Sequence, residues 1–235
     1  KDFSYDNRNE PDEVINQINK VLKQCYSTHK KGFPIYFHCK AGVNRSFKIS
    51  ALFKVYTRIM EATQRPKIYQ LEDWIMEACF DIKEKRSCVD FDRNYWRKQF
   101  SSIKHFLLEI AKKDELKLID LSDRSHQKTD DDFYYNNIRL EAQYELYSYR
   151  KHLRVTKDKY SGSISGEKEK AVSQIIQSTQ VNSSDINLDR IKSSFATTLM
   201  QNKECLKQSR QYSSTSYAFL SALHHILYVL FTLGG

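Results

Sequence analysis

Residues 35–46 read Ile35-Tyr36-Phe37-His38-Cys39-Lys40-Ala41-Gly42-Val43-Asn44-Arg45-Ser46. An apolar, strand-like run leads into Cys39, and an amphipathic run without Gly or Pro begins after Arg45. This order predicts a short buried strand, a loop and then a helix. The thiol of Cys39 would then face the backbone N–H groups and the positive dipole end at a helix N-terminus, which bind a phosphate dianion and favour a thiolate.

Arg45 lies six positions after Cys39, and the five residues between them include a glycine. The planar guanidinium fork can hold two phosphate oxygens at once. None of the other four cysteines has an arginine six positions on. The combination indicates a phosphate-ester hydrolase with a cysteine nucleophile. The structural alternative is a buried cysteine at a strand end, with Arg45 as an ordinary surface residue.

The segment resembles the signature loop of the cysteine-based phosphatases, the protein tyrosine and dual-specificity phosphatase superfamily. The resemblance implies that Cys39 attacks phosphorus, that a phosphocysteine forms, and that water hydrolyses it. Ser46 would stabilise the leaving thiolate, although it could be a plain early-helix serine, and His38 would orient the loop and tune the thiol. The substrate phosphate would be bound by backbone N–H groups and the guanidinium, from Lys40, Ala41, Gly42, Val43, Asn44 and Arg45.

The leaving alkoxide or phenoxide needs a proton, so a carboxylic acid must face the thiol. In the family this aspartate lies a few dozen residues upstream, before the helix that leads to the catalytic strand. Asp6 precedes the helix that Pro11 opens and is the acid we expect. Asp2 is the second candidate and Asp12 the third; Asp6 could instead be only a turn residue.

The resemblance implies an α/β fold in residues 1–111: a phosphatase-like core with a sheet flanked by helices. The periodicity predicts a strand at residues 33–38 and helices from Pro11, over 45–62, 69–85 and 92–111. Residues 85–91 and 94–100 look like the family's closing segment, so the resemblance covers about residues 2–105. The strands that the family places upstream are missing. We expect either an N-terminally truncated piece, which is favoured, or another segment that replaces those strands.

Residues 112–235 are expected to form a mainly α-helical C-terminal region of unknown role. A strand-like run at 116–121 precedes a tyrosine-rich helix at 133–155 and a Ser/Gly linker at 161–166. Four apolar residues then share one helical face: Leu188, Ile191, Phe195 and Leu199. Residues 218–233 form an apolar run that is short for a membrane span, so a packed core helix is favoured over a membrane segment.

The chain carries 38 Lys+Arg against 29 Asp+Glu, a formal net charge of +9. This balance suits an anionic partner such as a phosphoprotein or a phosphoinositide membrane surface, while no pattern indicates nucleic acid. Five irregularly spaced cysteines predict neither a disulfide framework nor a zinc site, so no metal or cofactor is expected. Reduced thiols imply an intracellular, cytoplasmic setting. The oligomeric state is left open.

Three functions compete for this sequence. The first is a phosphatase that acts on phosphotyrosine or on mixed phosphoprotein substrates. The second is the same chemistry on phosphoinositides or inositol phosphates, since Lys40 resembles a basic residue in the loops of such enzymes. The third is a catalytically silent phosphate-binding or scaffolding protein. Asn44 and Phe47 are bulkier than the residues usual in the family, which leaves the substrate unassigned.

Overall fold

The computed structural model describes residues 11–40, 44–86, 93–113, 119, 130–156, 162–181 and 188–207. The chain divides into two compact units, residues 1–124 and 125–235, and each is considered by itself. The described ranges contain seven α-helices and no β-strand. None of these helices is both long and apolar enough to cross a membrane.

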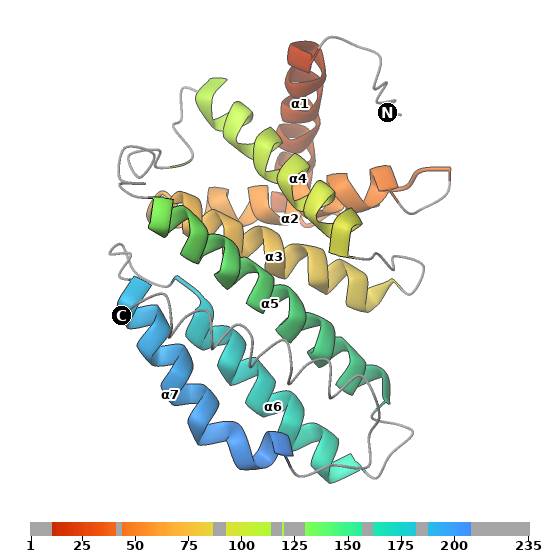
Figure 1. Cartoon of the computed structure of the whole chain (residues 1–235). Coiled ribbons are helices and arrows are strands. Elements are labelled where there is room, and N and C mark those ends of the chain that lie inside the picture. Colours follow the sequence, from red (N-terminus) through yellow and green to blue (C-terminus); the bar gives the residue numbers. More distant parts are fainter. Residues whose placement is uncertain are drawn as a thin grey trace. The chain divides into compact units, whose positions relative to one another are not determined.

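Unit 1 is a cluster of four helices: α1 (Pro11–Lys30), α2 (Asn44–Glu61), α3 (Ile68–Lys85) and α4 (Arg93–Lys113). Helix α2 contacts each of the other three (Figure 1). It is apolar over most of its circumference, which is typical of a central helix. Its buried apolar side chains form the middle of the core: Phe47, Ala51, Leu52, Phe53, Val55, Tyr56 and Ile59. These four helices occupy the segments where the periodicity predicted them.

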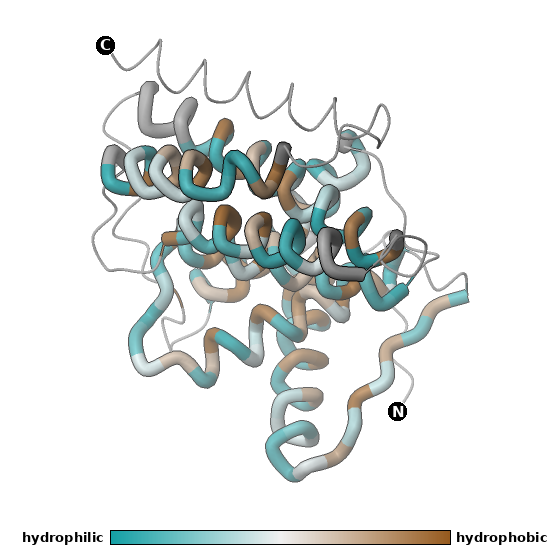
Figure 2. Tube along the Cα trace, turned by 90° about the horizontal axis from the view of Figure 1, so that it is seen from below, coloured by the Kyte–Doolittle hydropathy of each residue, from teal (hydrophilic) through white to brown (hydrophobic). Residues whose placement is uncertain are grey.

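The expected α/β core is wrong for the described residues, because residues 33–39 run as a single extended segment without a strand partner. Along this segment the backbone tube alternates between hydrophobic and hydrophilic residues (Figure 2), and Ile35, Phe37 and Cys39 are half-buried whereas Tyr36 is 82% exposed. The segment is therefore not the buried strand that we expected. The Phe37 ring packs on Phe53 of α2, with centroids 5.4 Å apart. A strand needs a neighbour that accepts and donates backbone hydrogen bonds, and the helices beside this segment use those groups internally.

The end of α1 is fixed by a left-handed glycine. Gly32 has φ +82°, its N–H donates to the carbonyl of His29 at 2.8 Å, and the Phe33 N–H donates to the carbonyl of Thr28 at 3.3 Å. These two bonds form the Schellman motif, which satisfies carbonyls that the last helical turn leaves open. The turn sets the direction in which the chain runs on toward Cys39.

Gly32→Ala and Gly166→Ala are expected to change stability in opposite directions. An alanine at Gly32 meets no atom within 4 Å, so only the left-handed backbone opposes it, at a cost of about 1–2 kcal/mol. Gly166 lies inside helix α6 (Gly162–Thr179) and is equally open, so alanine there should stabilise by about 0.5–1 kcal/mol. Urea unfolding of both variants measures the two effects. Equal signs would contradict the assigned backbone conformations.

Unit 2 contains α5 (Asp130–Thr156), α6 (Gly162–Thr179) and α7 (Leu188–Lys207). Helix α6 contacts both α5 and α7. Its last residue is held by buried side chains of α5: the Arg139 guanidinium donates to the Thr179 carbonyl at 3.2 Å, and the Gln143 amide donates to the same oxygen at 3.3 Å. Asn136 accepts two further bonds from Arg139. The polar network therefore caps the C-terminus of α6 inside the unit.

The predicted helices at 133–155 and around Leu188 to Leu199 are present as α5 and α7, with Phe195 and Leu199 buried. The predicted linker at 161–166 is wrong, because α6 already begins at Gly162. The buried apolar face of α6, which includes Val172, Ile175 and Ile176, outweighs the weak helix propensity of the Ser/Gly residues before it. Residues 218–233 lie outside the described residues, as does the run at 116–121 apart from Ile119.

Candidate functional site

The sulfur of Cys39 lies against the first turn of α2. The thiol donates to the Ser46 hydroxyl oxygen with an Sγ–Oγ distance of 3.4 Å. Ser46 is the third residue of α2 and is fully buried, while Cys39 is half-buried at the end of the extended segment. The sulfur is therefore next to a polar group and to the positive end of a helix dipole, where a thiolate is favoured.

Two exposed cations lie close to Cys39 and Ser46 in the sequence. Lys40 directly follows Cys39, and Arg45 is in the same helical turn as Ser46; both residues are exposed to solvent. Lys48, one turn further along α2, is half-buried with its ammonium 5.7 Å from the centre of the Phe106 ring, and desolvation lowers the pKa of its amine. Lys48 is thus committed to α4, whereas Lys40 and Arg45 can meet an incoming anion.

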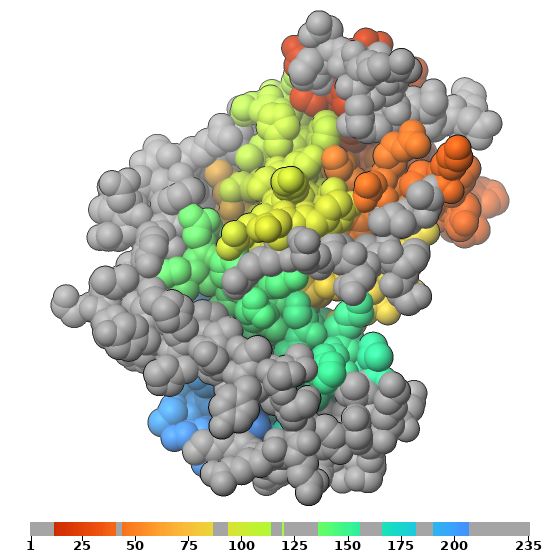
Figure 3. Space-filling view, turned by 45° about the vertical axis from the view of Figure 1, so that its right-hand side comes forward, coloured from red at the N-terminus to blue at the C-terminus, as the bar shows by residue number. Residues whose placement is uncertain are grey.

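Helix α4 holds the start of α2 from the other side. The Tyr95 hydroxyl donates to the side-chain oxygen of Asn44, the first residue of α2. On the face in Figure 3, α4 (yellow) lies beside the orange region that includes the start of α2. Burial raises the pKa of Tyr95, so its hydroxyl stays protonated and keeps donating. Asn44 is bulkier than the residue expected there, and this bond gives it a structural use.

Of the other residues expected to act at the loop, the structure describes His38. His38 is exposed, and its ring stacks on Tyr36 with centroids 5.9 Å apart and an interplanar angle of 23°. Side chains of consecutive extended residues point to opposite sides, so His38 faces away from the Cys39 side. Ala41, Gly42 and Val43 lie outside the described residues.

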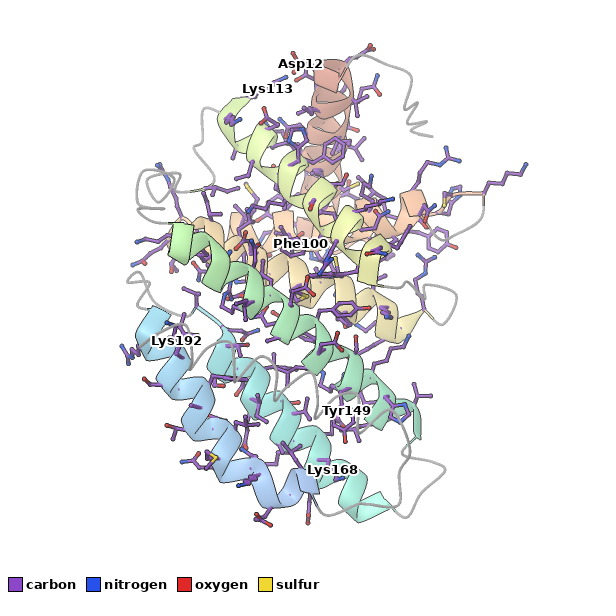
Figure 4. The ribbon with its side chains drawn as sticks, viewed as in Figure 1. Asp12, Phe100, Lys113, Tyr149, Lys168 and Lys192 are labelled. Atoms are coloured by element: carbon purple, nitrogen blue, oxygen red, sulfur yellow. The ribbon has the colours of Figure 1, made fainter. Side chains whose placement is uncertain are left out.

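Of the three candidate general acids, the structure describes only Asp12. Asp6 and Asp2 lie outside the described residues. Asp12 pairs with Lys113 of α4 at 2.7 Å, and the two side chains point toward each other in Figure 4. The hydrogen bond and the charge of Lys113 hold the pKa of Asp12 below its ordinary value. A general acid must carry a proton at working pH, so Asp12 is unsuited to that role.

Arg86 belongs to the candidate site although no motif in the sequence assigns it a role. It is the residue after α3, and its guanidinium Nη1 lies 3.5 Å from the Ser46 hydroxyl oxygen. Ser46 thus sits between the sulfur of Cys39 and the guanidinium of Arg86. The two partners of this bond are separated by 40 positions in the chain. The one signal in the sequence was that Arg86 lies in the segment that looked like the family's closing segment.

The other described cysteines are in less reactive surroundings than Cys39. Desolvation raises the pKa of Cys25 and of the fully buried Cys79. Desolvation and the Glu167 charge raise the pKa of Cys205 against the opposing charge of Lys168. None of these three cysteines, nor Cys39, is in a disulfide. Cys39 therefore stands apart in having a hydroxyl partner and a helix N-terminus at its sulfur.

Alkylation by iodoacetamide should follow these surroundings. The thiolate is the reacting species, so a raised pKa moves alkylation to higher pH. As the pH rises, we expect Cys39 to react first, Cys25 and Cys205 later, and Cys79 only on unfolding. Peptide mapping by mass spectrometry over a pH series gives the order. Cys39 reacting no earlier than Cys25 would show that its sulfur is an ordinary thiol.

The described residues bring together a thiol, a buried hydroxyl and the N-terminal turn of a helix, and the exposed cations Lys40 and Arg45 are their neighbours in the sequence. Such a set can bind a tetrahedral oxyanion and attack it with sulfur. No group of three His, Cys, Asp or Glu side chains that could hold a metal ion occurs in the described part of the chain. Comparisons with models of protein families, with curated proteins and with solved structures gave no match.

Proposed function

We propose that this chain is a cysteine-dependent phosphatase that hydrolyses phosphate monoesters through a phosphocysteine. The observation that carries the proposal is the 3.4 Å contact between the Cys39 sulfur and the Ser46 hydroxyl at the first turn of α2. A helix N-terminus attracts the phosphate dianion, and the sulfur at its edge is placed to attack phosphorus. The Cys-x5-Arg spacing supplies the guanidinium from the same turn.

In the first step the Cys39 thiolate forms the S–P bond while the bond from phosphorus to the ester oxygen breaks. The leaving oxygen takes a proton from an acid, for which Asp6 is the candidate. Negative charge on the equatorial oxygens is stabilised by Arg45 and by the N–H groups at the start of α2. In the second step water attacks phosphorus, inorganic phosphate leaves, and the sulfur departs as a thiolate that the Ser46 hydroxyl stabilises.

The substrates we propose are phosphoproteins, with phosphotyrosine or mixed phosphoresidues as the group removed. The exposed cations Lys40 and Arg45 and the net charge of +9 support an anionic macromolecular substrate. The cysteine mechanism needs reduced thiols, so we also propose an intracellular place of action. Phosphoinositides present the same phosphate chemistry and enter as the other arm of the test.

The test is hydrolysis of p-nitrophenyl phosphate by the whole chain, with and without vanadate, followed by phosphopeptides and phosphoinositide vesicles. We expect vanadate-sensitive release of nitrophenolate and faster turnover of phosphopeptides. If phosphoinositides in the vesicles are hydrolysed faster than the phosphopeptides, the substrates are phosphoinositides and not phosphoproteins. If the chain binds vanadate but hydrolyses none of these substrates, the proposed phosphatase activity is wrong and the chain is a phosphate-binding protein.

A further inference from the structure

We infer that Arg86 is a positioning residue that aims the Ser46 hydroxyl at the Cys39 sulfur. The inference rests on the proposed function, since it assigns how the leaving thiolate is stabilised. Ser46 is fully buried, and its oxygen lies 3.4 Å from the sulfur and 3.5 Å from Nη1 of Arg86. The hydroxyl thus has one partner from the extended segment and another from the end of α3.

The chemistry of the two neighbours determines which way the hydroxyl donates. A guanidinium has donors and no acceptor, so Ser46 must accept on the Arg86 side. A serine hydroxyl carries one proton, which is then left for the sulfur. Against a neutral thiol the sulfur can itself donate, but a thiolate can only accept, so O–H to S⁻ is the arrangement that Arg86 enforces. The hydrogen bond to an ionised sulfur is the stronger kind.

The positive charge of Arg86 adds to this effect. Arg86 reaches the buried hydroxyl from the end of α3, where its own backbone N–H donates to the Ile82 carbonyl at 3.0 Å. The side chain can therefore be replaced without loss of that backbone bond. The Arg86 guanidinium and the Cys39 sulfur are separated by the Ser46 hydroxyl, which contacts both. At this separation the guanidinium charge attracts a thiolate, and a partly buried site screens that attraction weakly.

Arg86→Met tests the inference, because methionine keeps much of the length and has no donor. We expect this variant to hydrolyse the phosphocysteine about tenfold more slowly. Pre-steady-state burst kinetics on p-nitrophenyl phosphate measure that step. The alkylation rate of Cys39, taken at the pH where the wild-type rate is half-maximal, should also fall about tenfold. Arg86→Lys, which keeps donors and charge, should recover most of both rates.

The double variant separates positioning from general packing. In a Ser46→Ala background, Arg86→Met should change either rate less than about twofold, because the hydroxyl it aims is gone. The matched control is Arg58→Met, which removes another arginine contact between α2 and α3, to Glu77 at 2.6 Å, and should leave the pH profile of Cys39 unchanged.

Equal effects of Arg86→Met with and without Ser46 would overturn the positioning role, as would an alkylation profile identical to that of wild type. The alkylation measurement needs no turnover. It therefore tests Arg86 even if p-nitrophenyl phosphate is not hydrolysed. Absence of hydrolysis in the wild-type chain counts against the proposed function alone, so the two failures are distinguishable.

Discussion

Replacing Cys39 by serine is expected to lower kcat for p-nitrophenyl phosphate by about 10⁴-fold or more, because the proposed nucleophile is lost. A serine hydroxyl is nearly the same size as a thiol, but it is almost entirely protonated at neutral pH. It also leaves poorly from phosphorus in the second step. The helix N-terminus and Arg45 are unchanged, so the variant should still bind vanadate reversibly.

The control for this variant is Cys25→Ser on α1, which removes a different half-buried thiol outside the site. Its kcat should stay within about twofold of wild type, since it touches no reacting group. Thermal melting of both variants separates loss of chemistry from loss of folding. A Cys39→Ser protein that is folded and still active would show that another residue performs the reaction.

Asp6→Ala is expected to lower the hydrolysis rate of phosphotyrosine peptides by about 10²–10⁴-fold. Without an acid the leaving oxygen departs as an anion, so the loss should be larger for tyrosine than for the better leaving group nitrophenolate. The acid works only while protonated, so wild-type turnover should fall as the pH rises above its pKa. That fall on the alkaline side should disappear in the variant. Stopped assays over a pH series measure both effects.

Asp2→Ala and Asp12→Ala are the comparisons for Asp6. Asp12 pairs with Lys113 and is held ionised, so its loss should leave the leaving-group dependence unchanged. If Asp6→Ala retains full activity and Asp2→Ala is inactive, the acid is Asp2 and the assignment of Asp6 is wrong. Both outcomes are compatible with the proposed role of Cys39 as the nucleophile.

The helices of unit 1 were predictable because their apolar residues repeat at helical spacing. Val14, Ile15, Ile18 and Leu22 are buried on α1, and Val21, which has the same helical spacing, is half-buried. An apolar circumference is typical of a central helix, and α2 contacts α1, α3 and α4. The spacing of apolar residues predicts both that a segment is helical and which of its faces is buried, so helices can be predicted well from the sequence.

The strand at 33–38 shows what periodicity does not report. The alternation of half-buried and exposed side chains around Phe37 and Tyr36 is present, yet no strand lies beside the segment in the described residues. A helix satisfies its own backbone groups, whereas a strand depends on a second segment whose presence a local pattern cannot indicate. The sheet was implied by the resemblance to a family and not by the periodicity of the residues.

Only contacts between residues that are close in the sequence could be predicted for the candidate site. Cys39 and Ser46 are separated by one short loop in the sequence, and their side chains are in contact. Arg86 reaches Ser46 because α3 packs on α2, and no spacing rule brings residues 40 positions apart into contact. Likewise, Asn44 looked like a departure from the family, and its bond from Tyr95 depends on how α4 docks.

The most direct measurement of the central claim is acid quenching of a single turnover, followed by mass spectrometry of the peptide that contains Cys39. A sulfur placed at the mouth of α2 predicts one phosphate on Cys39, absent from Cys39→Ser and depleted when water has time to react. Released product with unmodified Cys39 at every quench time, or phosphate found on another residue, would contradict the account.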